Sequence, residues 1–266
     1  MTRKWCTSLA GLTLAAGLAA TAPALAATTG HQAAPRATAA HTPRLGGPLR
    51  LVPGTHPIRT GHRRFAVGSP NWSGYAVSGG KFKKVSASWT LNAVTCPSGS
   101  ADAAPWVGID GFNDKTVEQT GSDSICSSGK PKYVAWYEMF PAPPVFLAKT
   151  VKPGDHFTGT VTHTTGTSYT LTLADTTQGW TNTVHKSLSA KNASAEAVLE
   201  LAFPKLANFG TDKFTAVTVD SKPIGSYTTA PFTLTQMFIQ VGGTKCDATS
   251  ALSNKDAFSE TWKATC

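Results

Sequence analysis

Arginine is absent from residue 65 to the C-terminus of this 266-residue chain. The formal net charge is +9, from 24 lysines and arginines against 15 acids, but eight of these bases lie before residue 70. Residues 70–266 therefore carry 16 lysines against all 15 acids, a net charge of +1. A nucleic-acid-binding domain would cluster Arg and Lys on its folded part. The basic composition thus gives no support for a nucleic-acid partner.

Several catalytic signatures are also missing. The sequence has no GxSxG elbow, no HExxH and no paired Asp-Thr/Ser-Gly, which argues against a serine hydrolase, a zinc peptidase and a pepsin-like dyad. It has no Cys/His spacing typical of zinc, so we expect no metal and no cofactor. Three histidines remain beyond residue 69, each in a Thr-, Gly- or Asn-rich context typical of a surface side chain: His156, His163 and His185.

Long apolar runs are confined to the N-terminus. Arg3 and Lys4 precede an Ala/Leu/Gly run that ends in small residues at 24–26, so residues 1–26 are predicted to be a secretory signal peptide, in an alanine-rich style typical of bacteria. Residues 27–69 carry six arginines and no acid, and we expect a disordered basic propeptide, with a flexible linker as the alternative. Residues 70–266 then form one secreted, extracellular domain with no membrane partner.

Cysteines are few. Of the five, Cys6 leaves with the signal peptide, and the even number that remains in an exported chain predicts two disulfides. Three pairings are possible, and we favour the local one, Cys96–Cys126 with Cys246–Cys266. No cysteine is then left as a nucleophile.

The rest of the chain reads as short strands. Runs rich in Val, Thr, Phe, Tyr and Trp alternate with turn residues, and no long amphipathic helix appears. This pattern predicts an all-β domain of the sandwich type. The expected strands cover residues 86–91, 134–140, 157–162, 169–173, 195–201, 214–219 and 235–241.

The most informative stretch is residues 105–121, which reads as two strands joined by a polar turn. Because strand side chains alternate, Trp106, Gly108 and Asp110 should share one face. On the second strand Val117 and Gln119 should share one face, and Glu118 should lie on the opposite face. By the same parity, Glu196, Val198 and Glu200 share a face further along the chain, and so do Trp136, Glu138 and Phe140.

Four motifs occur in order: WVGIDG from Trp106, QTG from Gln119, AWYE ending at Glu138, and AE-three-residues-E from 195 to 200. In this order they resemble the glutamic peptidases, or eqolisins, over roughly residues 70–266. The resemblance implies a β-sandwich of two large antiparallel sheets, like concanavalin A. It also implies a catalytic dyad of Gln119 and Glu200, with Glu196 as the alternative base.

The resemblance assigns roles as well. Glu200 would be the general base that activates a water, and Gln119 would hold that water and donate to the oxyanion. A carboxylate base suits acid pH. Substrate-cleft roles are implied for Trp106, Asp110, Trp136, Glu138, Phe140 and Glu196. The sequence departs from the family pattern at Glu118, Met139, Phe140 and Ala197, which bears on substrate preference and rate.

The expected partners are protein or peptide substrates and the chain's own propeptide, with the protein a monomer. We expect Arg59, Arg63 or Arg64 to pair with Glu196, Glu138 or Asp110 at neutral pH, which would keep the precursor latent. The alternative function is a non-catalytic module that binds peptide or carbohydrate, since Trp106, Trp136 and Trp180 would suit that role too.

Overall fold

The computed structural model describes residues 66–266. These residues form strands joined by turns and loops, with one short 3-10 helix, Ile224–Ser226. The strands are β1 (Ala66–Ser69), β2 (Trp72–Ser78), β3 (Lys84–Thr90), β4 (Ala104–Ile109), β5 (Val117–Ser127), β6 (Lys130–Phe140), β7 (Val145–Phe146), β8 (His156–Thr165), β9 (Ser168–Asp175), β10 (Trp180–Ser187), β11 (Ser194–Glu200), β12 (Thr211–Val219), β13 (Lys222–Pro223), β14 (Thr233–Val241), β15 (Thr244–Lys245), β16 (Asp247–Thr249) and β17 (Phe258–Trp262).

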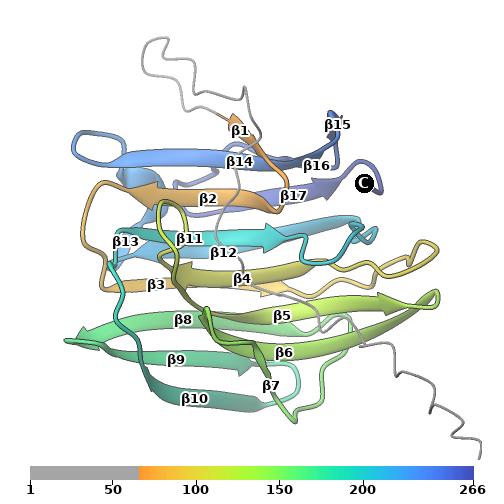
Figure 1. The fold of residues 1–266 in the computed structure, drawn as a ribbon, viewed down its shortest axis with the longest axis horizontal. Coiled ribbons are helices and arrows are strands. Elements are labelled where there is room, and N and C mark those ends of the chain that lie inside the picture. The colour runs from red at the N-terminus through yellow and green to blue at the C-terminus, as the bar shows by residue number, and fades with distance from the viewer. Residues whose placement is uncertain (1–65) are drawn as a thin grey trace, which may run out of the picture. The chain divides into compact units, whose positions relative to one another are not determined.

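The strands form two sheets, which confirms the predicted all-β sandwich. The nine-stranded sheet runs β1-β14-β2-β11-β4-β5-β6-β7, with β15 beside β14, and Figure 1 shows its central strands side by side in this order. The eight-stranded sheet runs β10-β9-β8-β3-β12-β17-β16, with β13 beside β12. Strand β1 is parallel to β14, and the other neighbouring strands among residues 66–266 pair in antiparallel fashion.

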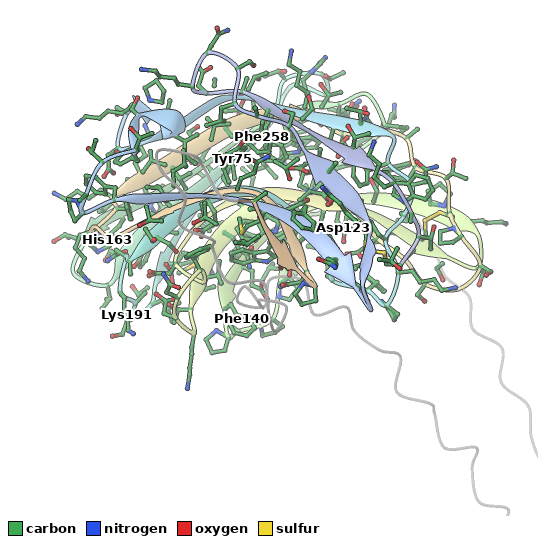
Figure 2. All side chains as sticks on the ribbon, turned by 90° about the horizontal axis from the view of Figure 1, so that it is seen from above. Tyr75, Asp123, Phe140, His163, Lys191 and Phe258 are labelled. Carbon is green, nitrogen blue, oxygen red and sulfur yellow. A yellow bond between two sulfur atoms is a disulfide. The ribbon has the colours of Figure 1, made fainter. Side chains whose placement is uncertain are left out.

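The main core lies between the two sheets. It is rich in aromatic rings, which bury large areas and favour edge or offset contacts. Tyr75 of β2 meets Phe258 of β17 with ring centroids 5.0 Å apart, and Phe258 stacks on Phe214 of β12 at 4.8 Å. In Figure 2 Tyr75 and Phe258 lie close together, and Phe140 lies well apart from them. These contacts tie the two layers together.

The centre of the nine-stranded sheet is buried on both faces. Strand β3 of the other sheet alternates between buried and partly exposed residues, as a strand with one wet face should. Strands β2, β4 and β11 are instead buried at every position. The outer face of this sheet, which points away from the eight-stranded sheet, therefore carries its own apolar cluster, which includes Trp72, Trp106 and Trp136.

Both local disulfides are present. Cys96 bonds Cys126 at the end of β5, and Cys246 bonds the C-terminal Cys266. The pairing favoured from the sequence is therefore confirmed. The first bond holds the loop before β4 against β5, and the second holds the chain end beside β16.

All the strands expected from residue 86 onward are present. Strand β10 was not predicted, because a Thr-, Asn- and Ser-rich edge strand resembles a loop in composition. The five-residue strand β17, which lies between β12 and β16, was not predicted either. Residues 66–69, assigned to the propeptide, form β1, and Val67 there is buried in the outer cluster. The predicted signal peptide, the rest of the propeptide and the three latch arginines lie outside the described residues. In residues 66–266 no helix is long and apolar enough to cross a membrane.

Candidate active site

The predicted site residues converge on the outer face of the nine-stranded sheet. Strand register places Glu138 of β6 opposite Gln119 of β5, Gln119 opposite Gly108 of β4, and Gly108 opposite Glu196 of β11. This row runs across four neighbouring strands. The predicted parity of β4, β5, β6 and β11 is thus confirmed, and it puts the amide and the acids on one surface.

Gln119 is held by Glu138. The Gln119 Nε2 donates to Glu138 Oε2 at 2.8 Å, and the residue has no exposed surface. Its Oε1 accepts no hydrogen bond from the described residues. A primary amide has two N–H donors and a carbonyl acceptor. One donor is therefore committed to Glu138, which leaves the other donor and the carbonyl oxygen for a reacting group.

Trp106 reaches from the same face to the second predicted catalytic residue. Its indole Nε1 donates to Glu200 Oε2 at 3.0 Å, and Glu200 is 2% exposed. Trp106 requires glycine at positions 108 and 121 of the neighbouring backbone. A Cβ at Gly108 would lie 2.7 Å from Trp106 Cζ3, and one at Gly121 would collide with Trp106 Cβ. Small residues at these two positions thus make the trough that aims the indole at Glu200.

The charge of Glu200 affects the pKa of Glu138, the hydrogen-bond partner of Gln119. Burial and, after it, the nearby charge of Glu200 raise the pKa of Glu138 to about 9, although the hydrogen bond from Gln119 acts in the opposite direction. Glu138 is therefore neutral in acid. Gln119 with Glu138 and Trp106 with Glu200 are thus two hydrogen-bonded pairs on the same face of the sheet, close enough for the charge of Glu200 to act on Glu138.

Three comparisons with known proteins agree. The family model described as Peptidase A4 family matches residues 70–261. The chain belongs to the Peptidase A4 family. It is 29% identical to Aspergillopepsin-2 of Aspergillus niger over 217 residues, which cover 68% of this chain and 74% of that protein.

Solved structures show the same fold. Scytalido-glutamic peptidase, crystallised with a transition state analog inhibitor, matches with a TM-score of 0.62 and 24% identity, over 73% of this chain and 98% of that one. Aspergilloglutamic peptidase from Aspergillus niger matches with a TM-score of 0.50 and 27% identity, over 61% and 99%. Membership of the Peptidase A4 family makes this chain an enzyme that hydrolyses peptide bonds, with protein or peptide substrates.

This membership decides against the non-catalytic alternative. The three tryptophans considered for it also do not lie together. Trp106 and Trp136 belong to the outer cluster, but Trp180 lies on the other sheet, where it contacts Phe157 and donates to Thr150 O. A single binding surface made from all three is therefore not what the fold provides.

Two further acids of this A4 peptidase stand on opposite faces of the sheet. Glu196, on the same face as Glu200, has no exposed surface, and burial raises its pKa well above the ordinary value, as do nearby acids such as Asp110. Glu118 faces the inter-sheet core, and burial raises its pKa to about 9. Both are therefore neutral in acid. Glu196 can line the site as an uncharged hydrogen-bonding group.

Asp110 does not continue the strand. Strand β4 ends at Ile109, and Asp110 adopts a φ of 71° that turns its side chain onto the loop before β11. Its carboxylate accepts backbone N–H groups from Lys191, Asn192 and Ala193. The predicted shared face with Trp106 and Gly108 is lost because the backbone enters the left-handed region there. Asp110 thus positions a loop, and its substrate contact stays a prediction.

Aromatic side chains border the dyad. Trp72 meets Trp106 edge-on with ring centroids 4.9 Å apart, and Trp136, Phe112 and Phe140 pack in the same outer cluster. Motif analysis did not single out Trp72 or Phe112 as site residues. The available signal for Phe112 was a hydrophobic residue in a polar turn, three positions after Ile109.

A cavity of about 540 Å³ lies beside Asp110 and the loop that Asp110 holds. It is lined by the turn after β4 and the loop before β11, at residues 113–116 and 189–191. Within the part of the chain that the structure describes, no three potential metal ligands are grouped together.

Proposed function

We propose that the protein is a secreted endopeptidase that works in acid through Gln119 and Glu200. The observation that carries this proposal is that both side chains lie on the outer face of the sheet in hydrogen-bonded positions: Gln119 is held by Glu138, and Glu200 accepts the N–H of Trp106. Two disulfides support an extracellular site of action. The signal peptide and the bacterial origin stay predictions.

In the proposed reaction Glu200 takes a proton from a water as the water oxygen attacks the peptide carbonyl carbon. The carbonyl π electrons move to oxygen, and the free N–H of Gln119 donates to the resulting oxyanion. Glu200 then gives its proton to the amide nitrogen, the C–N bond breaks, and an acid and an amine leave. The hydrogen bond that Trp106 donates to Glu200 favours the charged form that a base requires.

Glu138 acts through Gln119 in this scheme. As a neutral acid it fixes the amide plane without placing a negative charge beside the developing oxyanion. A charged carboxylate there would oppose the oxyanion electrostatically. The raised pKa of Glu138 is therefore useful to a peptidase of this design, and Glu138 is a positioning residue in our proposal.

The direct test is digestion of a denatured protein at about pH 3–4. Gln119→Ala should lower kcat/KM by about 10²–10³-fold, the usual effect of losing one oxyanion donor. Gln240→Ala is the matched control, because Gln240 lies on β14 of the same sheet and donates only to a backbone carbonyl, Gly243 O. Unchanged hydrolysis in Gln119→Ala would refute the dyad.

Trp106→Phe should weaken the base. It keeps the ring in the trough but removes the N–H that bonds Glu200, a hydrogen bond to a charged group typically worth about 1.5–3 kcal/mol. The acid limb of the kcat/KM profile should therefore move up by about one pH unit. A profile that falls uniformly without moving would show that the indole only packs.

A further inference from the structure

We infer that Asp123 is a positioning residue that shares one proton with Glu200 and so keeps the base ionised in acid. This inference rests on the proposed function and adds a residue that the motif analysis did not single out. Asp123 lies on β5 four residues after Gln119, so both side chains point to the outer face of the sheet. Figure 2 labels its position.

Strand register brings Asp123 and Glu200 together. Ser124 N donates to Ala103 O at 3.1 Å, which continues the β4–β5 ladder and sets Asp123 beside Ala104. Ala104 is in turn the register partner of Glu200 on β11. Neighbouring strands lie about 4.8 Å apart. Two acidic side chains therefore face each other across one alanine, whose methyl group leaves the space between them open.

Asp123 is buried beside the backbone N–H groups of Ser124 and Ala103, whose effect lowers its pKa but is smaller than that of burial. It has no exposed surface, and neither carboxylate oxygen makes a hydrogen bond of good geometry. Its neighbour on β6 is the apolar Val134. The other acid that faces it is Asp102, whose carboxylate accepts the backbone N–H groups of Ala202 and Phe203. Burial, followed by the charges of Asp102 and Glu200, raises the pKa of Asp123 well above its ordinary value.

These facts favour a pair that holds one proton. Two buried carboxylates on one face of a sheet, separated by a single alanine, cannot both ionise cheaply, so one stays protonated. Glu200 already receives an N–H from Trp106, which favours its charged form, so the proton belongs on Asp123. The protonated Asp123 then adds no charge near Glu200. As pH rises, loss of this proton puts a second negative charge near the base.

The test compares pH profiles of kcat/KM for the full chain and Asp123→Asn, with folding followed by circular dichroism at each pH. Asn keeps the shape and a donor but has no proton to lose. We expect the alkaline limb of kcat/KM to lie at least one pH unit higher than in wild type. Asp123→Ser should move the alkaline limb in the same direction and serves if the Asn variant does not fold.

Asp212→Asn is the matched control. Asp212 is also buried, and its pKa is raised to about 8, but it lies on β12 of the other sheet. An unmoved alkaline limb in the Asp123 variants, or an equal movement in Asp212→Asn, would overturn the inference. The two proposals fail separately: full activity in Glu200→Gln would refute the dyad, whereas an inactive Glu200→Gln with an unmoved Asp123→Asn profile would refute only the shared proton.

Discussion

Glu200→Gln is expected to lower kcat/KM by about 10³-fold at acid pH, within the usual contribution of a positioned general base. The glutamine can still accept the Trp106 N–H through its Oε1, so the trough and the fold should persist. A neutral amide cannot take the proton from water, however. The measurement is the initial rate of peptide hydrolysis over a series of pH values, with circular dichroism as the check on folding.

Glu196→Gln is the sharpest control for this variant. Glu196 and Glu200 lie on the same strand and the same face, and both are buried. Because Glu196 is protonated at acid pH, replacing it with an isosteric neutral amide should change kcat/KM by less than about tenfold. If the two variants showed the opposite pattern, Glu196 would be the base and the assignment of Glu200 would be wrong.

Thermal stability is expected to fall steeply as pH rises from 4 to 8. Several carboxyls are buried, and burial raises the pKa of Asp102 to about 7, of Asp212 to about 8 and of Glu118 to about 9. Their ordinary values are 3.8 for Asp and 4.5 for Glu. Between the ordinary and the raised pKa the folded chain binds more protons than the unfolded chain. Stability is therefore complete below about pH 4 and is lost as pH rises through the folded values.

Scanning calorimetry from pH 4 to pH 8 measures this loss. We expect Tm to drop by at least about 10 °C, since about 1 kcal/mol changes Tm by roughly 2–4 °C in a domain of this size. Asp212→Asn should flatten the curve between pH 4 and 8, because it removes one of the titrating groups. A Tm that stays constant or rises over this range would contradict the burial of these acids in neutral form.

Much of the fold followed from local pattern. Alternation and turn residues located the central strands, because half-buried strands such as β3 and β9 have one apolar face. Strand β10 was missed because it is an edge strand with alternating exposed polar residues. The placement of β1 beside β14 is a contact between distant segments, which no local pattern encodes.

The site followed partly from motifs and parity. Parity grouped Gln119 with Val117, and Glu138 with Trp136 and Phe140, but only the strand register shows that Gln119 lies opposite Glu138 and bonds it. It failed at Asp110, where a positive φ redirects the side chain to a loop. Asp123 has the same parity as Gln119, yet its meaning depends on the register of β5, β4 and β11, which only the folded structure gives.

Double-mutant kinetics of Gln119→Ala and Glu200→Gln test the dyad most directly. If both side chains act on one water and one carbonyl, their losses are strongly non-additive, and the double variant should be no more than about tenfold slower than Glu200→Gln alone. Losses that multiply in full, or near-wild-type hydrolysis by either single variant, would contradict a shared catalytic unit.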